Sequence, residues 1–236
     1  MKHIIAIQGK KGSGKDEVAK YINYMLGTPS FMHHFWIGKL LNFKPINKKW
    51  HLTRYASKLK ELLSILMNVN IEDFEDRKFK EEHYFNFKEY KLYNKNTVKN
   101  PIGDKNFSRK LKDGQLDLAL KYDLSIRQIL QFFGTDIMRR FFGDELWVHT
   151  TLNVPYDNLI IADQRFKIEN KIISSKEYNS KIFHVIRTSA SGGLHPSEKE
   201  LDELYENKKY DYLIDNNQTL YELFNQIKRI LHVSRS

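Results

Sequence analysis

The chain has 236 residues, a formal net charge of +10 and no cysteine. The lack of cysteine excludes disulfides and thiolate metal sites, and no apolar run approaches the roughly 20 residues that span a bilayer, so we expect a cytoplasmic protein without membrane association. Residues 1–69 hold 12 basic and 3 acidic side chains, which indicates either a basic surface for polyphosphate or nucleic acid or, as we favour for most of these lysines, a general bias of the composition.

The first elements alternate between strand and helix. The apolar run in residues 3–8 predicts a buried strand, and residues 15–26 predict a helix that ends at Gly27-Thr28-Pro29. Residues 28–50 are aromatic and basic without a clear period. We therefore interpret them as an insertion before a short strand near residues 50–54.

Leucines at helical spacing predict a helix over residues 55–67. The segment that follows, residues 70–124, is polar and rich in tyrosine. Asp113-Gly114 is a favoured two-residue turn and predicts a hairpin around it. Residues 83–124 are too many for an ordinary connection, so we expect a functional insertion there.

The C-terminal half again alternates between helix and strand. Residues 125–142 predict one continuous helix, with Ser125 as its N-cap and Phe141 on its apolar face. Further elements are expected as helices at 144–152, 166–177, 197–207 and 218–231, and as strands at 159–162, 182–186 and 210–214. Apolar strands alternating with helices predict an α/β fold with a mostly parallel sheet covered on both faces. We expect a single domain over residues 1–236.

The motif with the clearest chemistry lies at the first strand-to-helix junction. Residues 9–16 read GKKGSGKD, which matches the phosphate-binding pattern G-x4-G-K-[ST] through Lys15 and places Asp16 where a hydroxyl belongs. Glycines let backbone N–H groups converge on phosphate oxygens, and the helix N-terminus adds a positive dipole. The alternative is a surface turn that happens to contain glycine and lysine, and the position of the motif argues against it.

Four further segments carry short motifs. They are S-I-R-Q at 125–128 continuing through Gln131, Gly134-Thr135 and Trp147; D-Q-R-F at 163–166 with Glu169; H-P-S-E at 195–198; and D-N-N at 215–217 with Leu220. Together with the loop that ends in G-K-D, their order and spacing resemble phage-type deoxynucleoside monophosphate kinases. The resemblance is good over residues 1–26, 52–82 and 125–232.

This resemblance implies a P-loop kinase three-layer fold with inserted nucleotide-binding and lid segments, and suggests a viral or phage origin. It implies transfer of the γ-phosphate of ATP to a deoxynucleoside monophosphate, with Mg²⁺ as cofactor. On the donor side it implies that ATP is bound by Gly9, Gly12, Ser13, Gly14, Lys15, Asp16 and Glu17. Asp16 is the expected magnesium residue, directly or through water, or else it orients the acceptor. Glu17 replaces the threonine that is common in the family.

On the acceptor side, the resemblance implies that the monophosphate is bound by Arg127, Gln128, Gln131, Gly134, Thr135, Trp147, Asp163, Arg165 and Glu169. Arg127 has the fork geometry for a phosphate dianion. Trp147 is either a stacking face or a packing residue, with equal weight. Asp163 contacts the acceptor or the hydrated magnesium. Glu169 holds the base, steadies Arg165 or is a solvated helix residue.

Arg187 ends a predicted strand and begins a small-residue loop. We expect residues 188–197 to form a lid that brings a cation to the transferring phosphate, with His195 as a hinge or cap. His33-His34 lacks a carboxylate or third ligand at metal spacing, which favours a core or surface position.

Two other functions remain as alternatives. One is a kinase of another small phosphorylated acceptor, such as phosphomevalonate, whose animal-type kinases share the G-K-D loop. The other is a nucleic-acid-binding P-loop ATPase, which is disfavoured because no second motor motif and no aromatic–basic strand pattern is seen. A homodimer is compatible with the sequence.

Overall fold

The computed structural model describes residues 1–35, 44–190 and 196–233. The chain forms two compact units: unit 1 comprises Met1–Tyr55 and Thr151–Ser236, and unit 2 comprises Ala56–Thr150. Among the described helices, none combines the length and the hydropathy that crossing a lipid bilayer requires.

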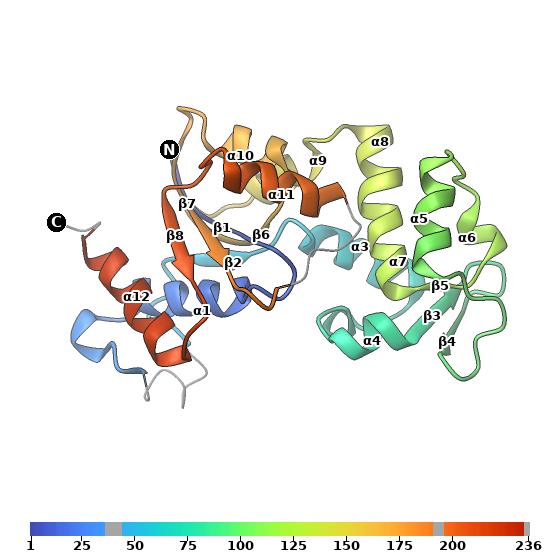
Figure 1. Ribbon diagram of the computed structural model, residues 1–236, viewed down its shortest axis with the longest axis horizontal. Helices are drawn as coiled ribbons and strands as arrows, with labels where there is room; N and C mark the ends of the chain where they lie inside the picture. Colours follow the sequence, from blue (N-terminus) through green and yellow to red (C-terminus); the bar gives the residue numbers. More distant parts are fainter. Residues whose placement is uncertain (36–43, 191–195, 234–236) are drawn as a thin grey trace. The chain divides into compact units, whose positions relative to one another are not determined.

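Unit 1 is built around a five-stranded sheet in which neighbouring strands run parallel in the order β2-β6-β1-β7-β8 (Figure 1). The strands are β1 (Lys2–Gln8), β2 (His51–Thr53), β6 (Asn158–Gln164), β7 (Tyr178–Ile186) and β8 (Tyr212–Asp215). Residues 4–7 of β1 are all buried because helices cover both faces of the sheet. The predicted parallel sheet and α/β class are confirmed.

Four helices of unit 1 cover this sheet. They are α1 (Lys15–Leu26), α10 (Lys167–Ile173), α11 (Pro196–Glu206) and α12 (Leu220–Val233). On one face, Ile22 of α1 and Phe224 of α12 join Ile7 and Val185 in an apolar core. On the other side lie α10 and α11, as Figure 1 shows. The carboxyl ends of the parallel strands therefore meet at one edge, where β1 passes into the phosphate-loop motif.

The first part of the 28–50 segment packs against α12 through His33 and Phe35. It contains the short 3₁₀ helix η1 (Ser30–Met32), and Phe35 contacts Phe224 at 5.7 Å between ring centroids. His33 is buried, and its Nε2 lies 2.7 Å from the carbonyl oxygen of Thr28. This contact gives His33 a structural role. Residues 36–43 lie outside the described part of the chain.

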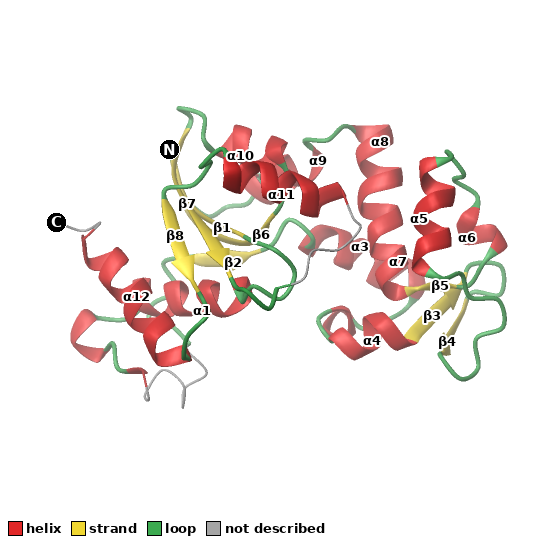
Figure 2. Cartoon of the chain, viewed as in Figure 1, coloured by secondary structure: helices red, strands yellow, loops and turns green. Residues whose placement is uncertain are grey.

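Unit 2 combines short helices with a small antiparallel sheet of order β4-β3-β5 (Figure 2). Its elements are α3 (Ser57–Met67), the 3₁₀ helix η2 (Ile71–Phe74), α4 (Arg77–Glu82), β3 (His83–Asn86), β4 (Lys91–Asn94), α5 (Asp104–Lys112), α6 (Leu118–Lys121), β5 (Leu124–Ser125), α7 (Ile126–Gln131), the π-helical segment η3 (Phe132–Ile137) and α8 (Met138–Phe142). Helix α9 (Leu146–Leu152) crosses the boundary into unit 1. The 83–124 insertion thus supplies the small sheet together with α5 and α6.

The hairpin predicted at Asp113-Gly114 is wrong. The amide of Gly114 donates to Leu111 O at 2.9 Å, and that of Gln115 donates to Lys110 O at 3.0 Å. These bonds satisfy carbonyls at the end of α5, so Asp-Gly terminates a helix here. The hairpin of unit 2 is instead β3–β4, in which Tyr84 pairs with Tyr93.

The continuous helix predicted over 125–142 contains a π-helical turn. Ser125 is the N-cap as predicted, in a capping box with Gln128. The wider turn of η3 then rotates the residues that follow relative to a regular helix. Consequently Phe141, which was expected on the apolar face, is 64% exposed.

Candidate functional site

The phosphate loop, residues 9–16, connects the carboxyl end of β1 to the first turn of α1. The Ser13 amide donates to Lys10 O at 3.1 Å and closes a tight turn. Gly14, the N-cap of α1, has a φ of 93°, a conformation that side chains with a Cβ rarely adopt. The amides of Glu17 and Val18 donate to Gly14 O at 3.1 Å. The amides of Lys15 and Asp16 precede them in the first turn, and such leading amides are the usual basis of anion binding at a helix N-terminus.

The loop is braced from the last strand of the sheet. Asn216 follows β8, is buried, and its Nδ2 donates to Ser13 O at 2.8 Å. Asn216 belongs to the D-N-N motif of residues 215–217, for which no role in the site was predicted. The sequence feature that could have identified Asn216 is its position just beyond the carboxyl end of a parallel strand, because the phosphate loop lies at the same edge of the sheet.

Lys15 is 7% exposed, and its Nζ donates to Lys10 O at 2.7 Å within the same loop. Burial, reinforced by the charge of Arg165, lowers the pKa of Lys15 to about 8, against the opposing influence of Asp16, Glu198 and Asp163. A buried cation at the head of a helix is a strong attractor for a phosphate dianion.

Asp16 is paired with Arg54, a residue that sequence analysis missed. The Nη2 atom of Arg54 lies 2.8 Å from Asp16 Oδ1, and the Asp16 side chain is 66% exposed. Loss of surrounding water would raise the pKa of Asp16, but the hydrogen bond and charge of Arg54 outweigh it and lower the pKa. Arg54 follows β2 directly, at the same edge of the sheet.

Glu17 lies on α1 one turn before Tyr21. Burial and the neighbouring Glu17 carboxylate raise the pKa of the Tyr21 hydroxyl. The carboxylate is thus placed beside a tyrosine of the same helix.

Asp163 and Arg165 lie at the end of β6, as predicted. The Oδ1 atom of Asp163 accepts a hydrogen bond from the Tyr55 amide at 2.7 Å. The Nη1 atom of Arg165 lies 3.0 Å from Glu198 Oε1 on α11. Glu169 accepts hydrogen bonds from the amides of Arg165 and Phe166 at 2.7 and 2.9 Å. It therefore caps α10 and fixes the backbone of Arg165.

Arg187 follows β7 and is exposed. The next residue, Thr188, donates its amide to Asn217 Oδ1 at 2.7 Å. The predicted lid at 188–197 is described only in part, because residues 191–195, including His195, lie outside the described residues.

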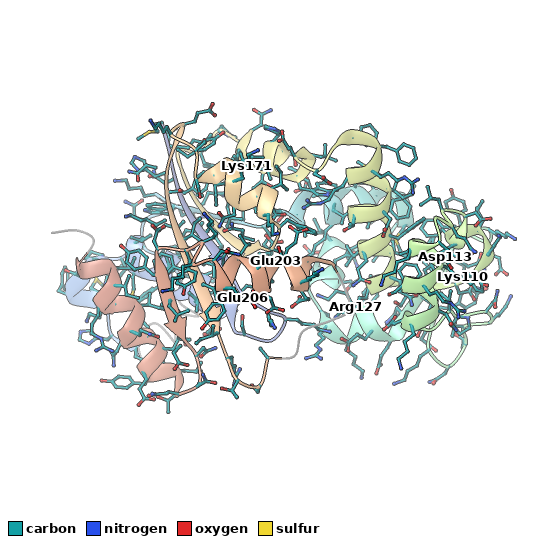
Figure 3. All side chains as sticks on the ribbon, turned by 45° about the horizontal axis from the view of Figure 1, so that its top comes forward. Lys110, Asp113, Arg127, Lys171, Glu203 and Glu206 are labelled. Atoms are coloured by element: carbon teal, nitrogen blue, oxygen red, sulfur yellow. The ribbon has the colours of Figure 1, made fainter. Side chains whose placement is uncertain are left out.

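In unit 2, Arg127 and Gln128 occupy the first turn of α7 (Arg127 is labelled in Figure 3). Arg127 Nη2 lies 2.9 Å from Glu81 Oε1 on α4. Gln128 is buried: its Oε1 accepts from the Ser125 amide, and its Nε2 donates to Ile102 O at 2.9 Å and Asp104 Oδ1 at 2.8 Å. Gln128 thus holds unit 2 together, and a direct nucleotide contact from it stays a prediction.

The π-helical turn brings Gly134 and Trp147 together. Trp147 is 6% exposed, and its Nε1 donates to Gly134 O at 2.8 Å. A Cβ on Gly134 would lie 2.7 Å from Leu59 Cδ2 of α3, so glycine permits close packing there. Both residues have packing roles, while Gln131 and Thr135 are half-buried nearby on the same helix. Base stacking by Trp147 stays a prediction.

The described residues contain no cluster of three or more side chains able to cage a metal ion. Asp16 and Asp163 both act electrostatically on Lys15. One or two carboxylates beside phosphate groups suit Mg²⁺, which keeps several waters and shares substrate oxygens. The donor set therefore fits a magnesium ion bound with a nucleotide.

A family model, a viral protein and a solved structure are among the matches to known proteins. A family model described as deoxynucleotide monophosphate kinase matches residues 3–227. The chain is 31% identical over 117 residues to a protein of Acanthamoeba polyphaga mimivirus named "Putative deoxynucleotide monophosphate kinase", covering 43% of this chain and 58% of that relative. Among solved structures, dephospho-CoA kinase from Campylobacter jejuni matches at 12% identity and a TM-score of 0.34, covering 98% of this chain and 96% of that one.

Proposed function

The chain belongs to the deoxynucleotide monophosphate kinase family, and we propose that it transfers the γ-phosphoryl group of ATP to a deoxynucleoside monophosphate. The observation that carries this proposal is the loop between β1 and α1, which sets a buried Lys15 at a helix N-terminus. The family membership favours this acceptor over a phosphomevalonate-like substrate and over a nucleic-acid-dependent ATPase.

On the donor side, we assign the triphosphate of ATP to Gly9, Gly12, Ser13, Gly14, Lys15, Asp16 and Glu17. Lys15 releases Lys10 O and binds phosphate oxygens, because a charged acceptor forms the stronger hydrogen bond. The buried hydroxyl of Ser13, which has no hydrogen-bond partner among the described residues, is a further donor at this loop.

On the acceptor side, we assign the monophosphate to Arg127 and the nucleoside to Gln131, Thr135 and the surrounding helix. The Arg127–Glu81 pair is partly exposed, and such pairs are worth about 0–1 kcal/mol. Phosphate can therefore take the place of Glu81 at little cost. In transfer, an acceptor phosphate oxygen bonds to the γ-phosphorus as the bond from that phosphorus to the β–γ bridging oxygen breaks, leaving ADP.

We assign to Arg165 and Arg187 the stabilisation of the negative charge that spreads over the transferring phosphoryl group. Asp16 and Asp163 are the residues that would hold Mg²⁺, which when bound neutralises charge on the phosphate oxygens. Asp163, Arg165 and Arg187 lie at or just beyond the carboxyl ends of β6 and β7, where ligands of parallel sheets bind, and Asp16 lies in the first turn of α1, where the phosphate loop ends.

A coupled assay with ATP, Mg²⁺ and each of dGMP, dTMP, dCMP and dAMP tests the proposal. We expect turnover of at least one monophosphate and loss of that turnover in Lys15→Ala. No turnover above the Lys15→Ala background with all four acceptors would contradict the proposed function.

Arg127→Ala separates the two substrates. We expect it to weaken binding of the monophosphate much more than binding of ATP. Arg77→Ala is the matched control, because Arg77 Nε also pairs with Glu81, at 3.3 Å, but is more exposed. Equal loss for both substrates in Arg127→Ala would remove the acceptor assignment.

A further inference from the structure

Helix α11 contacts the phosphate loop at two points. Glu198, in its first turn, accepts a hydrogen bond from the Lys11 amide at 3.4 Å. Asp202, one turn later, pairs with Lys10 Nζ at 2.6 Å. The spacing of four residues puts both carboxylates on the same face of α11. This face of α11 therefore binds the phosphate loop at Lys10 and Lys11.

Glu198 differs from Asp202 in its burial and in its second partner. The Glu198 side chain is 6% exposed, whereas that of Asp202 is 48% exposed. Its Oε1 pairs with Arg165 Nη1 at 3.0 Å, and its Oε2 accepts from the loop. One buried carboxylate thus bridges an arginine at the end of β6 and the backbone of the phosphate loop. Burying a charge is costly unless it is paired and hydrogen-bonded. The buried Glu198 carboxylate is therefore kept in place by its contacts with Arg165 and with the Lys11 amide.

The main chain and the side chain of Arg165 are fixed by different residues. Glu169 accepts a hydrogen bond from the backbone amide of Arg165 at 2.7 Å, whereas the guanidinium of Arg165 pairs with Glu198. The Arg165 side chain is 35% exposed, and a long, partly exposed side chain has many rotamers in solvent. Glu198 is the ion-pair partner that the structure gives it.

We infer that Glu198 is a positioning residue that holds the Arg165 guanidinium beside the phosphate loop. This inference rests on the proposed kinase function, in which Arg165 meets the transferring phosphoryl group. Glu198 itself need not touch either substrate. Its effect on transfer passes through Arg165, since a displaced cation stabilises the transition state less.

The first test compares Glu198→Gln with Glu203→Gln. Glu203, labelled in Figure 3, lies on the same helix but pairs with Lys167 of α10. We expect Glu198→Gln to lower kcat by about tenfold or more while KM for ATP changes by less than about threefold, as for an interaction made in the transition state. Glu203→Gln should retain kcat within about twofold, because a partly exposed pair contributes little.

A double-mutant cycle with Arg165→Ala separates positioning from a general structural effect. If Glu198 acts through Arg165, adding Glu198→Gln to Arg165→Ala should cost less than about a further twofold in kcat. Two full, multiplicative losses would overturn the inference. Should Glu198→Gln fold poorly, Glu198→Asp keeps the charge on a shorter arm and should lose part of kcat, with the same non-additivity toward Arg165→Ala.

The activity of the unmutated protein decides the proposed function before any variant is compared. If the unmutated protein is active and Glu198→Gln behaves like Glu203→Gln, the inference about Glu198 is overturned and the proposed function stands. If no acceptor is turned over, a crystal structure of Glu198→Gln still decides the positioning role. An Arg165 guanidinium that keeps its place within hydrogen-bond distance of residue 198 in that variant would then refute it.

Discussion

Gly14 and Asn216 make a direct test of how the phosphate loop is braced. Gly14 has a φ of 93°, and a Cβ built on it would overlap Asn216 Nδ2, with Asn216 Cγ at 3.4 Å. In Gly14→Ala the left-handed backbone conformation costs about 1–2 kcal/mol, and the overlap with a buried side chain adds about 1–3 kcal/mol. We therefore expect Gly14→Ala to lower the free energy of unfolding by about 2–5 kcal/mol.

Asn216→Ala should cost about 1–3 kcal/mol on its own, because it leaves the buried carbonyl of Ser13 without its donor. It also removes the atoms that the new Cβ would overlap. The double variant should therefore be more stable than the sum of the single losses by about 1–3 kcal/mol, measured by urea unfolding followed by circular dichroism.

Gly12→Ala is the matched control for this cycle. Gly12 also has a positive φ, 85°, but its Cβ would meet Ala190 Cα at 3.9 Å, an ordinary contact. Its loss should be the same, within about 0.5 kcal/mol, with and without Asn216. If Gly14→Ala is also additive with Asn216→Ala, the brace described between β8 and the loop is refuted.

Two further predictions concern buried polar groups. His184, whose ring lies tilted against those of Tyr205 and Tyr210, has a pKa lowered to about 4 by burial and by Lys15. Since the unfolded chain binds the proton near pH 6.5, this difference in pKa should remove up to about 3 kcal/mol of stability as pH falls from 6.5 to 4. His184→Phe should flatten that pH dependence in urea unfolding, and an unchanged dependence would refute this origin. Trp147→Phe should cost about 1–3 kcal/mol by leaving the Gly134 carbonyl unpaired, and an unchanged urea midpoint would show that this bond is not needed.

The fold of unit 1 was predictable because its signals are local and repeated. Strands β1, β6 and β7 each contain a short apolar run and are followed by a helical pattern, and the phosphate loop is contained in eight consecutive residues. Unit 2 was less predictable. A π-helical turn leaves no distinct periodicity in six residues, and Asp113-Gly114 suits a helix end as well as a hairpin. The expectation of one domain with insertions stays a prediction.

The candidate site was predictable only where it is contiguous in sequence. Arg54 pairs with Asp16 across 38 residues, and Asn216 reaches Ser13 across 203. Neither spacing has a period that reveals contact. The rule that ligands bind at the carboxyl edge of parallel strands could have nominated both, because each directly follows a strand.

The ion pairs of the candidate site fall into two physical types, and this division accords with the proposed chemistry. Asp16–Arg54 and Arg127–Glu81 involve partly exposed side chains, so each can open at a cost of about 0–1 kcal/mol. Residues that we propose to bind and release a nucleotide need partners that are exchanged this readily. Arg165–Glu198 has a buried carboxylate, and separating such a pair costs about 3–5 kcal/mol because a charge is left without a partner. A cation that must stay in one place through many turnovers needs that second kind of partner, and Arg165 is the arginine among these pairs that has it.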